Sequence, residues 1–110
     1  MTTTCFIRYE IDPNKKQEFE EYARTWGQVI PRCGADLVGY YSPHEGSSTT
    51  AYGIYNVGSL AEYEVYRERL LNDPLGKSNY EFAKREKFLL REERIFLRIA
   101  SRPHAEFIQT

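Results

Sequence analysis

Two hydrophobic periods alternate along this sequence, and their order constrains the fold more than any other feature. Over residues 3–11 apolar side chains recur at every second position, which predicts a β-strand. Asp12 and Pro13 then provide an N-cap and a first-turn proline, and apolar residues recur every three to four positions as far as Ile30. A strand followed directly by an amphipathic helix is therefore expected at the start of the chain.

The second half of the sequence repeats this change of period after a hairpin. Two strands, over about residues 36–43 and 49–57, flank the loop sequence HEGSS, and the sequence SLAE at 59–62 has the form of a helix capping box. Asn72-Asp73-Pro74 interrupts that helix and begins another, which we expect to include Leu89 or Leu90, and a last strand follows within residues 94–100. The order strand, helix, strand, strand, helix, strand predicts an α+β, ferredoxin-like fold, with a four-stranded antiparallel sheet and helices on one face.

Length, charge and cysteine usage limit the class of protein. The chain has 110 residues, which we divide into a single domain over 1–101 and a C-terminal tail over 102–110. A formal net charge of −1 without a basic stripe argues against nucleic-acid binding, and no apolar run is long enough for a membrane span. Cys5 and Cys33 lack metal-ligand spacing, so we expect two buried thiols in a cytoplasmic protein without a metal site.

The sheet has a second face that the helices leave uncovered. On the helix-covered face we expect Ile7 and Tyr9 of the first strand together with the aliphatic residues of the last strand, which are Ile95, Leu97 and Ile99. The other face then combines two phenylalanines with opposite charges: Phe6, Arg8, Glu10, Arg94, Phe96 and Arg98. Aromatic and arginine side chains are typical of protein interfaces, so we expect this face to pair with a second copy of the chain as a homodimer.

Candidate ligand-binding residues come from the hairpin and from the helix that follows it. Tyr63 and Arg67 are four residues apart on that helix and would present a phenol and a cation to a ligand between helix and sheet. Tyr40 and His44, in the tyrosine-rich hairpin, complete the candidate set. The alternative is that Tyr63 belongs to the core, that the Arg67 stem packs beside it, and that His44 is a solvated loop residue. No catalytic residue can be named.

Three segments together resemble the NIPSNAP family: GYYSPHEGSST at 39–49, SLAEYEVYRERLLNDP at 59–74 and FLLREERIFLR at 88–98. The resemblance covers about residues 4–99, although Val38, Thr49 and Tyr55 stand where family members often have other residues. It implies a dimeric α/β-barrel, in which two sheets pack face to face. The family has no settled catalytic residues that the resemblance would assign to this chain. Relatives of the fold include cofactor-independent monooxygenases and haem-degrading enzymes.

Three functions are compatible with these observations. The first is a small-molecule-binding or structural dimer without a cofactor, whose ligand is apolar or aromatic. The second is a cofactor-independent monooxygenase-like enzyme acting on an aromatic or polyketide-like substrate, because such a site needs an aromatic-lined pocket rather than a metal cluster. The third is a haem-binding protein with His44 or His104 as the iron ligand. The sequence leaves open whether the protein is an enzyme.

Overall fold

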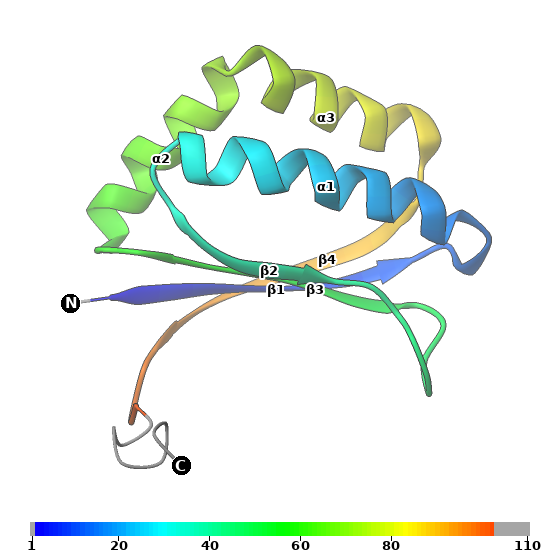
Figure 1. Ribbon diagram of the computed structural model, residues 1–110, viewed down its shortest axis with the longest axis horizontal. Coiled ribbons are helices and arrows are strands. Elements are labelled where there is room, and N and C mark those ends of the chain that lie inside the picture. Colours follow the sequence, from blue (N-terminus) through cyan, green and yellow to red (C-terminus); the bar gives the residue numbers. More distant parts are fainter. Residues whose placement is uncertain (1, 103–110) are drawn as a thin grey trace.

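The computed structural model describes residues 2–102 and has two layers, a sheet and a layer of helices on one side of it (Figure 1). The sheet has the order β2-β3-β1-β4 with all neighbouring pairs antiparallel, from β1 (Thr3–Ile11), β2 (Asp36–Tyr41), β3 (Thr50–Val57) and β4 (Leu89–Arg98). The helices are α1 (Lys16–Arg32), α2 (Leu60–Asn72) and α3 (Pro74–Glu86), and a 3-10 turn (Pro13–Lys15) precedes α1. The predicted ferredoxin-like α+β fold is confirmed. Residues 103–110 of the predicted tail, including His104, lie outside the described residues.

Side-chain caps begin the helical segments where the sequence predicts them. Asp12 accepts a hydrogen bond from the Asn14 amide, and Ser59 accepts one from the Glu62 amide. Asp73 caps α3 by accepting from the amides of Leu75 and Gly76. These contacts satisfy amides that would otherwise lack partners at the start of the 3-10 turn, of α2 and of α3.

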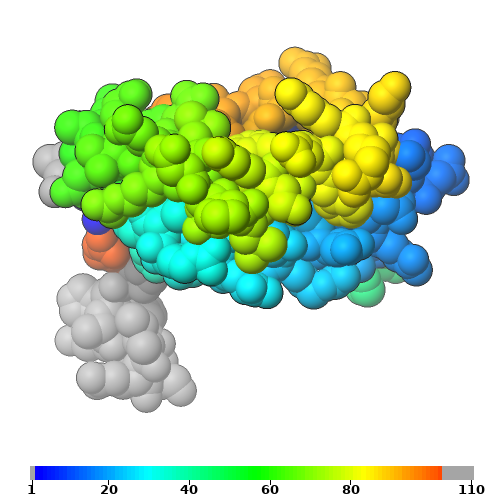
Figure 2. Space-filling view, turned by 90° about the horizontal axis from the view of Figure 1, so that it is seen from above, coloured from blue at the N-terminus to red at the C-terminus, as the bar shows by residue number. Residues whose placement is uncertain are grey.

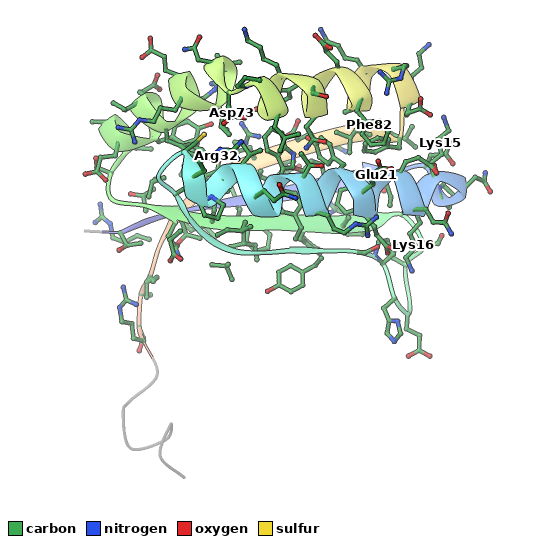
Figure 3. The ribbon with its side chains drawn as sticks, turned by 45° about the horizontal axis from the view of Figure 1, so that its top comes forward. Lys15, Lys16, Glu21, Arg32, Asp73 and Phe82 are labelled. Carbon is green, nitrogen blue, oxygen red and sulfur yellow. The ribbon has the colours of Figure 1, made fainter. Side chains whose placement is uncertain are left out.

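Asp73 also joins α3 to α1. Its two carboxylate oxygens accept from Nε and Nη2 of Arg32 at 2.8–3.0 Å, and the two side chains point toward each other across the helix ends (Figure 3). Asn79 makes a second connection between these helices. It is buried, and its side-chain amide donates a hydrogen bond to the backbone carbonyl of Tyr22 at 3.0 Å. Polar contacts therefore hold α1 and α3 in a defined register over the sheet.

Aromatic rings make up much of the core between the layers. Tyr9 lies near its centre, with ring centroids of Phe19, Tyr40 and Tyr22 at 5.5, 6.1 and 6.5 Å. Phe88, which follows α3, is fully buried and packs edge-to-face on Phe19 at 6.5 Å. Rings fill the core in a chain whose aromatic content is 15%, as tilted and edge-to-face pairs that suit the ring quadrupole.

The end of α3 differs from the expectation that this helix reaches Leu89 or Leu90. The helix ends at Glu86, and Lys87 adopts the left-handed conformation with φ of 53°. Its amide bonds the Ala83 carbonyl at 3.0 Å, a common way to end a helix. Leu89 and Leu90 therefore belong to β4, which is longer at its N-terminal end than the apolar pattern predicts.

A β-bulge in β4 reverses the side-chain placement predicted for that strand. Ile11 lies opposite Leu89, but Glu10 lies opposite Arg91, so Leu90 is an extra residue in the ladder and is 63% exposed. One inserted residue moves every later side chain to the other face of the sheet.

The consequence is that two predicted placements on β4 are wrong. Arg94 lies opposite Ile7 and Phe96 opposite Cys5, so Arg94, Phe96 and Arg98 are on the helix side and do not share a face with Phe6, Arg8 and Glu10. Ile95 and Leu97 are on the side away from the helices, which we call the outer face, and are 43% and 45% exposed. From β4, the outer face therefore carries Ile95 and Leu97 in place of the predicted Arg94, Phe96 and Arg98.

The outer face has an apolar centre that spans three strands. Phe6 of β1 lies opposite Ile54 of β3 and Ile95 of β4, and its ring centroid is 5.3 Å from that of Tyr52. Tyr41 lies opposite Tyr52 on this face, whereas Tyr40 lies opposite Gly53 on the helix side. Tyr40 and Tyr41, neighbours in the hairpin, therefore face opposite sides of the sheet.

Candidate functional site

A cavity of about 520 Å³ lies between the sheet and the helices. All three helices and all four strands contribute to its wall, which is rich in aromatic rings. It contains Trp26 and six tyrosines: Tyr22, Tyr40, Tyr55, Tyr63, Tyr66 and Tyr80. Volumes of this size and walls of this kind are typical of small-molecule sites.

Local sequence features bring these rings together. Tyr63, Tyr66 and Leu70 recur at helical spacing on α2, so all three face the sheet and are buried. Tyr40 reaches the cavity across β3 because Gly53 lies beneath its ring, where a Cβ atom would be 2.7 Å from the ring carbon Cε1. The Tyr40 hydroxyl is 3.2 Å from the Tyr9 hydroxyl, which fixes the inner end of the ring.

Four tyrosines of the cavity are uncharged hydrogen-bonding groups. Burial is the largest cause that raises the pKa of Tyr22, Tyr40, Tyr55 and Tyr66 above the ordinary tyrosine value. A phenol with a raised pKa keeps its proton at physiological pH and is able to donate a hydrogen bond to a ligand. The deep part of the cavity is thus aromatic, neutral and lined with O–H groups.

Two buried polar atoms of side chains on the cavity wall make no hydrogen bond of ordinary length and angle within residues 2–102, although Trp26 lies beside the Tyr22 phenol and Tyr66 beside the Tyr55 phenol. These are Nε1 of Trp26 and the hydroxyl of Tyr66, and both side chains are 3% exposed. An indole N–H can only donate, and buried donors are almost always paired in folded proteins. Because both atoms have almost no accessible surface, a ligand or an ordered water reaches them only when these side chains shift.

Arg94 brings a positive charge to the same cavity from β4. Its Nη1 donates to the Tyr63 hydroxyl at 3.1 Å and its Nη2 to the Glu92 carboxylate at 2.8 Å, while the Phe96 ring packs on the Tyr63 ring at 4.8 Å. The side chain of Arg94 is 32% exposed, so the guanidinium lies at the boundary between the cavity and solvent. In the view onto the helices, part of β4 remains visible in orange beyond α2 and α3 (Figure 2).

Three of the four predicted ligand-binding residues line this cavity, namely Tyr40, Tyr63 and Arg67. His44 does not: it is exposed in the loop between β2 and β3. Whether these residues bind a ligand stays a prediction. Sequence reasoning missed Arg94 because the bulge at Leu90 changes its face, and it missed Trp26 and Tyr66 because a stripe of apolar rings is typical of a core.

The remaining chemistry of the described residues is sparse. Within residues 2–102, no three histidine, cysteine, aspartate or glutamate side chains are grouped so that they could hold a metal ion. Cys5 and Cys33 are buried free thiols that form no disulfide bond with each other. Every helix in this part of the chain is too short or too polar to cross a bilayer.

Comparisons with known proteins agree with this architecture. The NIPSNAP family model matches residues 4–102, and no curated protein matches the sequence. A NIPSNAP domain protein from Burkholderia xenovorans has a TM-score of 0.73 at 24% identity, over 93% of this chain and 99% of that one. A NIPSNAP family protein from Agrobacterium tumefaciens has a TM-score of 0.72 at 21% identity, over 88% and 91%.

A protein from Nitrosomonas europaea, described as a candidate antibiotic biosynthesis monooxygenase, also shares the fold. Its TM-score is 0.68 at 10% identity, over 92% of this chain and all of that one. At such identities the likeness shows the fold alone.

Proposed function

The chain belongs to the NIPSNAP family, and on that premise we propose that it is a homodimeric protein that binds a small apolar or aromatic molecule in the tyrosine-lined cavity. The observation that carries this proposal is the cavity itself, about 520 Å³ of space walled by aromatic rings and open to solvent on one side. Burial of an apolar ligand against these rings removes apolar surface from water and adds dispersion contacts.

Trp26 offers a direct test, because it is the sole tryptophan of the chain and lies on the cavity wall. Titration with neutral mono- and bicyclic aromatic compounds, excited at the red edge of the indole band, should give a saturable change in its emission. Binding should also raise the free energy of unfolding by about 2.7 kcal/mol at a hundredfold excess over Kd. Flat titrations with every compound would contradict the proposal.

The homodimer rests on the outer face of the sheet. Its centre exposes Ile95 and Leu97 beside Phe6 and Ile54, and large aliphatic residues gathered on one sheet face mark an association surface. Across this face Arg8 lies opposite Glu93 and Glu10 opposite Arg91, so charges of both signs surround the apolar centre. Size-exclusion chromatography with light scattering should therefore report twice the 12.9 kDa mass of one chain.

A cofactor-independent oxygenase is the second candidate function. It is supported by the fold shared with the Nitrosomonas europaea protein and by a cavity whose walls suit a planar aromatic substrate. The reaction class would convert an activated ring methylene to a carbonyl, with one atom of O2 entering the substrate and the other leaving as water. Oxygen consumption with a panel of anthrone-type compounds, without any added cofactor, tests it. Consumption no faster than in the absence of protein would count against catalysis.

A reducing compartment, the cytoplasm, is part of the same proposal. Both cysteines are buried free thiols, and burial is the largest cause that raises the pKa of Cys5 and of Cys33 above the ordinary thiol value. Such thiols are poor nucleophiles and have a packing role.

A further inference from the structure

We infer that the cavity selects an aromatic carboxylate, which binds Arg94 through its anionic group and accepts a hydrogen bond from Trp26 or Tyr66 through a second, neutral polar group. This inference rests on the proposed small-molecule function and narrows the ligand to one chemical class. Three independent features carry it: the free donor capacity of Arg94, the charge balance of the cavity wall, and the two unpaired donors inside.

Arg94 has donor capacity left for a ligand. A guanidinium carries five N–H groups in a planar fork, and the contacts to Tyr63 and Glu92 use one each. Those two contacts hold the head group in place, so little side-chain freedom is lost when a carboxylate binds. Planar forks of this kind bind carboxylates with two parallel hydrogen bonds.

The charges around Arg94 favour an anion. The wall of the cavity includes four basic side chains, Arg67, Lys77, Lys84 and Arg94, but two acidic ones, Glu81 and Glu92. Since Glu92 already pairs with Arg94 at 2.8 Å, a surplus of positive charge remains on the α2 and α3 side. A concave site with an excess of one charge attracts ligands of the opposite sign.

The two buried donors favour a second polar group on the ligand that is uncharged. Trp26 Nε1 and the Tyr66 hydroxyl are unpaired and buried, and the tyrosines around them are uncharged. A second carboxylate would be desolvated there without a counter-charge, whereas a carbonyl, ether or phenol oxygen would accept from either donor at little cost. The cavity therefore combines one cationic group on β4, Arg94, with aromatic rings and uncharged donors on its other walls.

A matched pair of probes tests this directly. 6-Methoxy-2-naphthoate and its carboxamide have the same rings and the same ether oxygen but differ in charge. Isothermal titration calorimetry should show the carboxylate binding at least about tenfold more tightly than the amide, which corresponds to about 1.4 kcal/mol. Added salt should weaken binding of the carboxylate and leave the amide unchanged.

Variants assign the effect to Arg94. Arg94→Gln should lower the affinity for the carboxylate about tenfold and leave the amide unchanged, and Arg94→Lys should lose less. Arg85→Gln is the matched control, because Arg85 lies on α3 outside the cavity and away from the outer face, and makes a similar contact to Glu86 at 3.3 Å. It should bind both probes as the unsubstituted protein does. A similar loss in both variants would overturn the role of Arg94.

The affinity gained from the methoxy group tests the role of Trp26 and Tyr66. The methoxy group should raise affinity over unsubstituted 2-naphthoate, and a variant carrying both Trp26→Phe and Tyr66→Phe should lose that gain. If the gain survives in this variant, the assignment of the second polar group is wrong.

The outcomes separate this inference from the proposed function. If carboxylate and amide bind equally and both change Trp26 emission, the cavity binds small molecules but does not select anions. The inference is then wrong, and the proposed small-molecule function is retained. If neither probe binds, both are overturned. The comparison of probes on the unsubstituted protein needs no variant, so it holds even if Arg94→Gln fails to fold.

Discussion

Arg94 of β4 donates a hydrogen bond over 3.1 Å to the phenol oxygen of Tyr63 on α2, so the edge strand of the sheet is tied to the helix layer at the cavity. The contact exists because the bulge at Leu90 turns Arg94 toward the helices. It positions a charged group beside an aromatic wall, and it connects the stability of the edge strand with the geometry of the candidate site.

Removing the Tyr63 hydroxyl should measure this connection. Tyr63→Phe is expected to lower the free energy of unfolding by about 1 kcal/mol, because Arg94 loses an acceptor in a partly buried position. Urea denaturation of Tyr63→Phe, Arg94→Gln and the double variant gives the coupling energy between the two side chains. Strictly additive effects would show that the hydrogen bond contributes nothing.

A charge on the outer face should separate the proposed homodimer. Ile95→Asp places a carboxylate in the apolar centre beside Phe6 and is expected to give monomers of 12.9 kDa at micromolar concentration in light scattering. The matched control is Val65→Asp on α2, since Val65 is 49% exposed and Ile95 43%. That variant should retain the mass of a dimer. Equal behaviour of the two variants would place the interface elsewhere.

Stability at acid pH should depend on Asp73. Hydrogen bonds from the Gly76 amide and from Arg32 hold the pKa of this carboxyl below its ordinary value. A depressed folded-state pKa stabilises the fold at every pH above the unfolded-state value of about 3.9, and this stability is lost as the pH falls through the folded-state pKa. The difference in unfolding free energy between the unsubstituted protein and Asp73→Asn should thus be constant near neutral pH and shrink below about pH 4. A difference that does not change with pH would contradict the charge-dependent role.

At alkaline pH the buried tyrosines should limit stability. Burial raises the pKa of Tyr9, Tyr22, Tyr40, Tyr55 and Tyr66. The unfolded chain ionises its tyrosines near pH 10 and the folded chain does not, so the unfolding free energy should fall as the pH rises above about 10. Phenolate absorbance and circular dichroism followed together should show these rings ionising in the same transition in which the fold is lost. Full ionisation of all tyrosines in a chain that stays folded would contradict this expectation.

The left-handed residue after α3 offers a stabilising substitution. Lys87 is exposed, has φ of 53° and caps the helix through its backbone amide alone. Lys87→Gly should raise the free energy of unfolding by about 1 kcal/mol, because glycine adopts this conformation without the steric cost of a Cβ atom. Lys84→Gly, inside the same helix, is the contrasting control and should lower it by a similar amount.

Local patterns in the sequence determined much of this protein. The alternation in β1 placed Ile7 and Tyr9 on the covered side, where both are buried, and the caps at Asp12, Ser59 and Asp73 marked where helical segments begin. These signals are local, because side-chain direction and first-turn hydrogen bonds depend on residues close in sequence. The same helical spacing indicated that Tyr63 and Arg67 share a face, and both line the cavity.

Only the tertiary structure decided which side of β4 faces the helices. The alternation of Ile95 with Arg94 and Phe96 is visible in the sequence, but its phase is set by hydrogen bonds to β1, some eighty residues away, and by the extra residue Leu90. A single bulge reverses the strand, and the apolar pattern alone does not reveal it. The same long-range register brings Arg94 into contact with Tyr63 and leaves Ile95 and Leu97 on the outer face, so both the candidate site and the candidate interface depend on it.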